Sequence, residues 1–137
     1  MAAADPKISY AATDAMLDAF DTAVAAGKLR IYESGSSPPA NADAAIAGTL
    51  LAELTFGTPA FGAADDGDLT AEAITPDSDA NAAGTADYFR IWDSAGTTCY
   101  FQGTAGEDAE DLILDDEDIT LHATVAVSSL VLTLARE

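Results

Sequence analysis

The 137-residue sequence has one cysteine, one histidine and one tryptophan, and only five lysines and arginines against 24 aspartates and glutamates. A single cysteine excludes an intrachain disulfide, a zinc ribbon and a CxxC redox motif. The basic residues are scattered and the net charge is −19, so binding to nucleic acid or to an anionic membrane surface is strongly disfavoured. The acidity fits a solubilising surface, adaptation to a saline environment, or docking onto a basic partner.

Long apolar runs are also missing. None approaches the roughly 18 residues that cross a bilayer, and the opening MAAADPKISY lacks the basic and apolar regions of a signal peptide. We therefore expect a soluble protein made in the cytoplasm. The length fits one domain, since a chain of this size buries roughly two thirds of its unfolded surface. We expect an N-terminal arm over residues 1–10 and a single domain over residues 11–137.

One amphipathic helix is predicted over residues 11–26, which belong to that domain. Its apolar face carries Met16, Leu17, Phe20 and Val24, and its opposite face carries Asp14, Asp18 and Asp21. Ser9 or Thr13 is expected to cap the start, where the aspartates suit the helix dipole. Gly27 is expected to end the helix. A single such helix needs another surface to cover.

That surface is predicted to be β, because short alternating segments separated by Gly, Pro, Asp and Ser clusters fill the rest of the chain. The segments lie at residues 28–34, 48–56, 68–75, 86–93, 97–103, 111–115 and 120–137. In the second, Leu50, Ala52, Leu54 and Phe56 are expected to share one face. The fold class predicted is an antiparallel β-sandwich or jelly-roll-like barrel of about eight short strands.

The stretch GTADYFRIWDSAGTTCYFQG (Gly84 to Gly103) contains the sole tryptophan and the sole cysteine and predicts an antiparallel hairpin. Alternation places Phe89 and Ile91 opposite their neighbours, as in a central hairpin packed on both faces. The residues expected in the hairpin core are Phe89, Ile91, Trp92, Cys99 and Phe101. In the closing segment the alternation slips at Ser128 and Ser129, which predicts a β-bulge or a bend.

No catalytic residue, metal site or cofactor is expected. The run EDAEDLILDDED (Glu107 to Asp118) holds eight carboxylates, but calcium needs six to eight converging oxygens, and DSDANAAG (Asp77 to Gly84) matches only the start of an EF-hand loop. Weak calcium candidates remain in the clusters Asp65–Asp66–Asp68, Asp77–Asp79 and Asp115–Asp118. Paired carboxylates for glycoside hydrolysis are expected by chance in so acidic a chain.

Nucleophilic catalysis has no complete signature either. His122 could act as a general base, but the sequence contains no GxSxG motif with a serine nucleophile. A pair with Cys99 would need a third, orienting group that the sequence does not identify. Cys99 lies in a strand pattern without nearby basic residues, which is typical of a small buried apolar side chain. No phosphate-binding glycine loop is present.

Four segments resemble a family of small structural proteins of tailed bacteriophages: RIYESGSSPPANADAAIAGTLLAELTF, PAFGAADDGDLTAEAIT, GTADYFRIWDSAGTTCYFQG and TVAVSSLVLTLA. The match covers roughly Lys28 to Ala135. The position of Glu33 before Ser34 and Gly35, and the acidity of the Glu107 to Asp118 run, depart from the family pattern. The resemblance implies a β-rich virion protein without catalysis, either a capsid decoration (cement) protein or a tail protein of the tube or fibre.

The expected location is the outer surface of the capsid, and the expected partners are the major capsid protein and further copies of this chain, as a trimer or dimer. The sequence leaves open the capsid or tail location, the symmetry axis and a third, less favoured class, a cation-dependent binding or hydrolytic module. The arm and helix are expected to make the partner contacts. The contact residues expected there are Pro6, Lys7, Ile8, Tyr10, Met16 and Phe20.

Overall fold

The computed structural model describes residues 7–107 and 112–133. These residues form one helix and ten strands, so the mainly β fold that the sequence predicts is confirmed. The elements are α1 (Tyr10–Ala23), β1 (Lys28–Glu33), β2 (Thr49–Phe56), β3 (Asp68–Thr70), β4 (Ile74–Thr75), β5 (Gly84–Thr85), β6 (Tyr88–Trp92), β7 (Cys99–Gly106), β8 (Leu112–Leu114), β9 (Asp118–Ile119) and β10 (Val127–Thr133).

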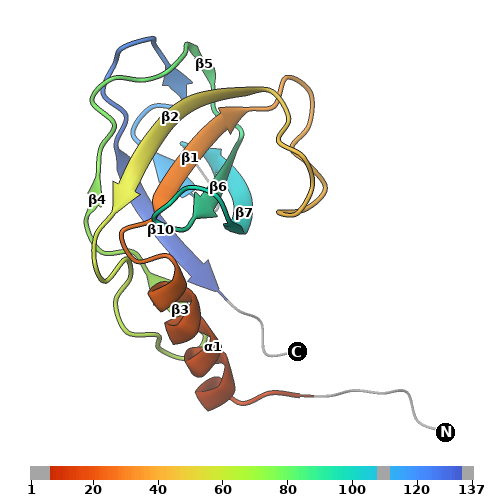
Figure 1. Cartoon of the computed structure of the whole chain (residues 1–137), viewed down its shortest axis with the longest axis vertical. Helices are drawn as coiled ribbons and strands as arrows, with labels where there is room; N and C mark the ends of the chain where they lie inside the picture. The colour runs from red at the N-terminus through yellow and green to blue at the C-terminus, as the bar shows by residue number, and fades with distance from the viewer. Residues whose placement is uncertain (1–6, 108–111, 134–137) are drawn as a thin grey trace, which may run out of the picture.

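Eight of these strands form one curled sheet in the order β3-β10-β8-β7-β6-β1-β2-β4, and β5 pairs with β9 in a small second sheet (Figure 1). Neighbouring strands of the large sheet are antiparallel except β7 and β8, which are parallel. The sheet is therefore mixed, whereas the sequence predicts purely antiparallel pairing.

The two edges of the large sheet are linked by a very short connection. The segment 68–75, predicted to be one strand, is two strands that pair at opposite edges, β3 with β10 and β4 with β2. The chain turns between them, where the Ala71 N–H donates to Leu130 O at 3.0 Å. Beyond β4, Asp77 and Val125 exchange two backbone hydrogen bonds of 3.0 and 2.7 Å. These links curl the sheet into a barrel-like shape.

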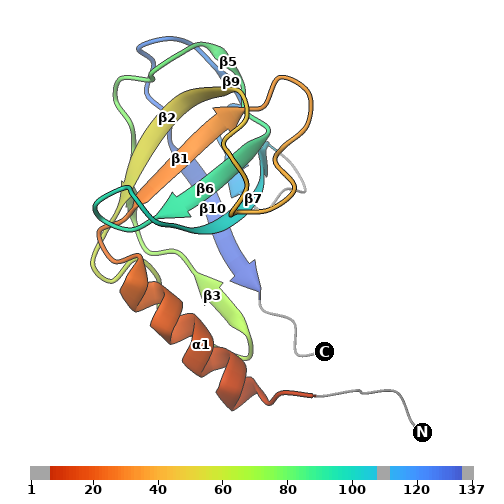
Figure 2. The ribbon, with the colours of Figure 1, turned by 45° about the vertical axis from the view of Figure 1, so that its right-hand side comes forward.

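The apolar core fills the inside of this curled sheet. Its fully buried side chains come from the strands and from the segment between β2 and β3, and include Leu29, Ile31, Leu51, Leu54, Phe61, Leu69, Phe89, Ile91 and Leu112. Helix α1 lies beside β3 at one end of the sheet (Figure 2). Its Leu17 is buried, and Phe20 packs against Phe61 and Phe101 with ring centres 5.9 and 6.3 Å apart.

The start and end of α1 can be assigned to particular residues. Ser9 is the N-cap, with a side chain that accepts from Ala12 N–H at 3.1 Å. The helix ends at Ala23 and not at Ala26, because Val24 is the C-cap and Ala26 takes the left-handed conformation, with φ of 56°. Gly27 is needed for a different reason than the one predicted: an added Cβ would lie 2.3 Å from Trp92 O.

The acidic face of α1 forms hydrogen bonds with the segment between β2 and β3. Three aspartates each accept a backbone N–H from the segment 61–67: Asp21 from Phe61 at 2.8 Å, Asp18 from Ala64 at 3.2 Å and Asp14 from Gly67 at 2.9 Å. None of them lies in the first turn, so the dipole role predicted for them does not apply. Met16, predicted on the buried face, is 48% exposed.

Bulges set which side chains face the core. The slip predicted at Ser128 is present, because the register of β10 with β8 shifts between Val127 and Ser129. In β2, Leu50 pairs with Tyr32 and Ala52 with Ile31, which leaves Leu51 as the extra residue. Leu51 is therefore fully buried while Leu50 is only half-buried, the reverse of the predicted alternation.

Candidate functional site

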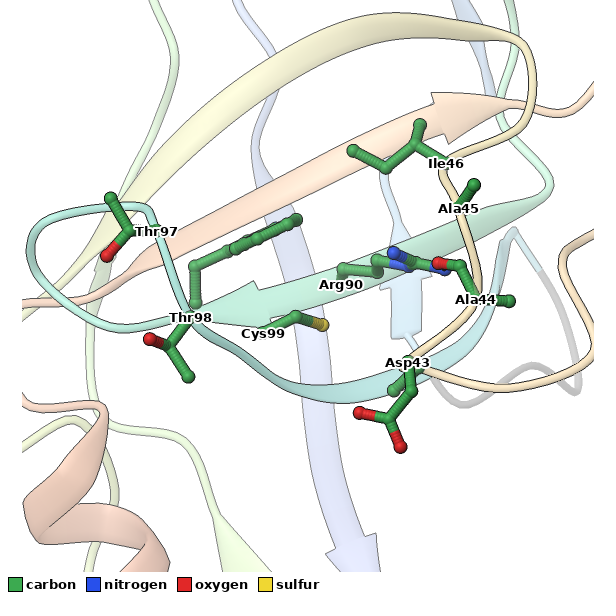
Figure 3. Close-up of a pocket in the computed structure, with 10 residues that line it drawn as sticks. Asp43, Ala44, Ala45, Ile46, Arg90, Thr97, Thr98 and Cys99 are labelled. Atoms are coloured by element: carbon green, nitrogen blue, oxygen red, sulfur yellow. The ribbon is translucent and has the colours of Figure 1, made fainter.

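The hairpin β6–β7 forms as the sequence predicts, and every residue of β6 is buried. Phe89 and Ile91 point to the core on the inner face, while Tyr88, Arg90 and Trp92 lie on the outer face. Residues 34–48, which we call the outer loop, run across this outer face (Figure 3). A strand with both faces covered explains why five consecutive large side chains are all buried.

Hydrogen bonds from side chains to the loop backbone hold the outer loop in place. The Tyr88 hydroxyl donates to Ala47 O at 2.7 Å and accepts from Ala47 N–H at 3.1 Å. Gln102 on β7 donates from Nε2 to Pro39 O at 2.7 Å. Two aromatic rings support this contact, because Tyr88 stacks on Tyr32 with ring centres 4.9 Å apart. Burial raises the pKa of both tyrosines above 10.0.

Arg90 is a buried cation with neutral partners. Its side chain is 2% exposed, and its Nε donates to Gln102 Oε1 at 2.9 Å. Its Nη2 donates to the outer-loop carbonyls of Asn41, at 3.2 Å, and Ala44, at 2.7 Å. Among residues 7–107 and 112–133, no carboxylate forms an ion pair with it. A guanidinium keeps its charge even when buried, so the site has a positive charge that no described carboxylate contacts directly.

Trp92 lies beside this cation, on the same face. The guanidinium of Arg30 sits over the indole ring at 5.0 Å, and Arg30 also pairs with Glu53 at 2.7 Å and donates to Gly96 O at 3.2 Å. The Trp92 side chain is 9% exposed, and its buried Nε1 lies beside the Tyr32 hydroxyl without the full geometry of a hydrogen bond. The indole is thus held by packing against Arg30, with its N–H beside the Tyr32 hydroxyl.

The β6–β7 turn is fixed by Asp93, whose Oδ1 accepts N–H groups from Thr97 at 3.0 Å and Thr98 at 3.3 Å. These hydrogen bonds stabilise the carboxylate and hold the pKa of Asp93 below its ordinary value. Gly96 has φ of 71°, a conformation that glycine adopts without strain. The turn therefore positions the start of β7 against the outer face.

A bulge at Tyr100 changes the predicted placement of Cys99. In the register of β6 with β7, Ile91 pairs with Phe101 but Trp92 pairs with Cys99, so Tyr100 is the extra residue. Cys99 and Phe101 consequently do not share a face. Of the five residues expected in the hairpin core, Phe89 and Ile91 lie within it and Phe101 packs against it, while Trp92 and Cys99 lie on the outer face.

The surroundings of the Cys99 thiol raise its pKa and so favour its neutral form. Cys99 is half-buried, burial raises the pKa of the thiol, and its Sγ donates to Phe101 O at 3.5 Å. The other candidate for nucleophilic chemistry, His122, contacts Asp79 at 2.5 Å, and both of these side chains are mostly exposed. The thiol and the imidazole, a pair that the sequence does not favour, thus have different partners.

An open pocket of about 450 Å³ lies between the outer loop and the hairpin. We call it the outer pocket. Its walls come from the outer loop, from β6 and from the β6–β7 turn with the start of β7 (Figure 3). The residues that line it are Ala42, Asp43, Ala44, Ala45, Ile46, Arg90, Trp92, Thr97, Thr98 and Cys99. The sequence shows one signal that points here, since Arg90 interrupts an otherwise apolar and aromatic run, YFRIW.

The expected partner-contact residues do not form one cluster of exposed side chains. Lys7, Ile8, Tyr10 and Met16 are exposed, whereas Phe20 packs against the core. Pro6 lies outside the described residues, as do residues 108–111 of the acidic run. Of the expected contact residues, Ile8, Tyr10 and Met16 therefore present apolar side chains to solvent.

The acidic clusters bind protein groups. Asp77 accepts N–H groups from Glu53 at 2.8 Å and Asp79 at 2.9 Å, and Asp115 contacts the Ser128 hydroxyl. In the part of the chain that the structure describes, no group of three or more His, Cys, Asp and Glu side chains is arranged to hold a metal ion. The calcium candidates of the sequence thus remain without a supporting geometry.

Comparison of the chain with models of protein families, with curated proteins and with solved structures gives no match. Among the described residues, no helix has the length and apolar character needed to span a membrane.

Proposed function

We propose that this protein is a structural component of a bacteriophage virion, a capsid decoration (cement) protein that binds the major capsid protein and stabilises the shell. The proposal starts from the sequence resemblance over roughly Lys28 to Ala135. In this function the protein acts as a trimer or dimer at symmetry axes of the capsid, and it needs a stable body and an adhesive surface instead of a catalytic centre.

The observation that carries the proposal is the exposure of large apolar side chains at the start of the chain. Ile8, Tyr10 and Met16 are 36, 40 and 48% exposed. Of the seven large apolar side chains that are exposed among the described residues, these three lie within residues 8–16, and such a concentration on an otherwise very acidic protein favours a contact site. The aspartate hydrogen bonds of α1 to residues 61–67 fix the helix on the body, so Met16 is presented on a rigid element.

The charge of the chain supports a protein partner. A net charge of −19 keeps many copies soluble before assembly and favours a basic docking surface over packaged nucleic acid. Each contact in a shell can be weak, because attachment at several neighbouring sites raises the effective concentration of the next contact.

A binding experiment with empty capsid shells tests the proposal. We expect the full-length protein to sediment with shells, and the double variant Ile8→Ser/Met16→Ser to lose most of this association while keeping its melting temperature. The matched control is Tyr100→Ser, which removes an equally exposed large side chain, 45% exposed, from the β6–β7 hairpin. If the double variant binds shells as well as the wild type does, residues 8–16 are not the contact surface.

Location in the particle is tested by electron cryo-microscopy of the virion. Density for this fold on the outer surface of the shell is the expected result. Density in the tail tube or in a fibre would overturn the decoration function and favour the tail function instead.

A further inference from the structure

We infer that the outer pocket is a binding site for a monocarboxylate group, with Arg90 as the residue that recognises it. The inference does not rest on the proposed function, because it depends only on the chemistry of the pocket. Its first support is the hydrogen-bond inventory of Arg90. A guanidinium has five N–H donors. Those of Nε and Nη2 reach Gln102, Asn41 and Ala44, and Nη1 has no acceptor among the described residues.

The donors of Arg90 that no described protein group engages favour a ligand that carries an acceptor. Arg90 is 2% exposed and all its protein partners are neutral, and burying an uncompensated charge is costly. A carboxylate supplies both the negative charge and the acceptor oxygens, and it forms strong charge-assisted hydrogen bonds with a guanidinium.

The pocket's own acid does not occupy this position. Asp43 lines the pocket from the outer loop, but its carboxylate points away from the Arg90 guanidinium (Figure 3). Asp43 is exposed, and it leaves the space beside Arg90 open to a ligand. Its negative charge at the rim, together with the net charge of −19, opposes dianions and polyanions such as phosphate esters. A ligand with a single negative charge is therefore favoured.

The other walls limit the size of the ligand. The loop side of the pocket is lined by the small side chains of Ala42, Ala44 and Ala45 and by the larger apolar side chain of Ile46. The volume of about 450 Å³ accommodates a short apolar body attached to the carboxylate. Two sources supply this chemistry: a free short-chain carboxylic acid, or the carboxylate of a polypeptide.

The sole tryptophan gives a direct measurement, because Trp92 lines the pocket. We expect titration of the full chain with sodium butanoate, at constant ionic strength, to change the Trp92 emission in a saturable way. Butanamide, the neutral isostere, is expected to give no saturable change. A parallel titration with acetyl-Ala-Ala, against the same dipeptide with an amidated C-terminus, distinguishes the sources: tighter binding of the acid dipeptide than of butanoate assigns the site to a polypeptide carboxylate, and the reverse assigns it to a free acid.

Two variants test the assignment to Arg90. Arg90→Gln is expected to weaken carboxylate binding about 10- to 100-fold, the equivalent of one hydrogen bond to a charged group. Loss of Arg90 can unfold the protein, so Ala45→Phe, which fills the pocket from the exposed loop and leaves Arg90 in place, is the second variant. It is expected to lower the affinity by a similar factor. Arg30→Gln is the matched control, since Arg30 also touches Trp92 but is already paired with Glu53.

The inference is overturned if neither butanoate nor the acid dipeptide gives a saturable signal, or if the neutral analogues bind equally well. It is also overturned if folded Arg90→Gln and Ala45→Phe proteins both bind as the wild type does. Equal weakening by Arg30→Gln would assign the carboxylate to a different cation and would likewise remove Arg90 from this role.

Discussion

The two faces of β6 are both buried, but they are buried by different chemistry. The inner face contributes Phe89 and Ile91 to a continuous apolar core. The outer face contributes Tyr88, Arg90 and Trp92, which are covered by a loop without regular structure that hydrogen bonds from side chains hold in place. On the inner face, the removal of apolar area from water and close packing stabilise the fold. On the outer face, the buried polar groups must each form a hydrogen bond, because an unpaired buried polar group is destabilising.

The comparison also explains where a binding pocket can exist. Side chains of the core interdigitate and leave no room for a ligand. The outer loop touches the sheet mainly at discrete hydrogen bonds, at Ala47, Ala44, Asn41 and Pro39, and space remains between these points. The outer face is therefore the side of the hairpin on which a ligand can bind.

The largest effect is expected from the inner face. Phe89→Ala should lower the free energy of unfolding by about 3–5 kcal/mol, because it removes a fully buried ring and leaves a cavity among side chains from several strands. Urea unfolding followed by circular dichroism measures the loss. Tyr100→Ala, at an exposed bulge position, is the control and should change stability by less than about 0.5 kcal/mol.

Trp92→Ala is expected to lower the free energy of unfolding by less, about 3 kcal/mol, which is the lower end of the range for buried aromatic rings. The ring is buried, but it lines an open pocket, so water can enter the space that the substitution creates. Urea unfolding of this variant beside Phe89→Ala makes the comparison. A loss as large as that of Phe89→Ala would mean that the outer face is packed like the core, and no loss would mean that the ring has only a surface role.

Tyr88→Phe isolates the polar contribution of the outer face. It removes the hydroxyl that both donates to and accepts from Ala47, while the ring that stacks on Tyr32 stays. We expect a loss of about 1–2 kcal/mol, because the Ala47 groups are left unpaired. Hydrogen exchange should accelerate at the Ala47 amide more than at the amides of β1. Uniform acceleration would show that the outer loop and the sheet open together.

The smallest expected effect is a loss of stability at alkaline pH that is specific to the outer face. The folded-state pKa values of Tyr32 and Tyr88 are raised above 10.0 by burial, so the neutral phenol is favoured in the folded protein. The stabilisation is complete below pH 10 and is lost as the pH rises through the folded-state pKa values. Thermal melts from pH 8 to pH 11 measure it. In Tyr88→Phe the alkaline decline should become shallower, and an unchanged decline would contradict the assignment.

Sequence patterns predict the inner face better than the outer one. Alternation identified Phe89 and Ile91, and the slip at Ser128 was visible because apolar residues change phase on either side of it. The bulges at Leu51 and Tyr100 were not visible, because the residues beside them have similar side chains and either phase looks apolar. A bulge is set by local backbone pairing that the apolar pattern does not record.

The outer loop could not be placed from the sequence at all. The prolines and small residues of GSSPPANADA indicate a break in the strands, but no periodicity states which surface such a segment covers. Its attachment depends on carbonyl groups, which every residue has and which leave no mark in the sequence. Of the hydrogen bonds between β6 and the outer loop, the sequence indicates only the donor, because Arg90 stands out in an otherwise apolar and aromatic strand.

The order of the strands in the large sheet bears on how the protein folds during synthesis. β10 follows every other strand in the chain, yet it lies between β3 and β8. While the ribosome is still making residues 127–133, β3 and β8 each have an unpaired edge able to bind another nascent chain. The barrel-like sheet is completed only when β10 enters it, so premature termination before Val127 should yield an aggregating fragment, and a slow final stretch of translation should lower the yield of folded protein.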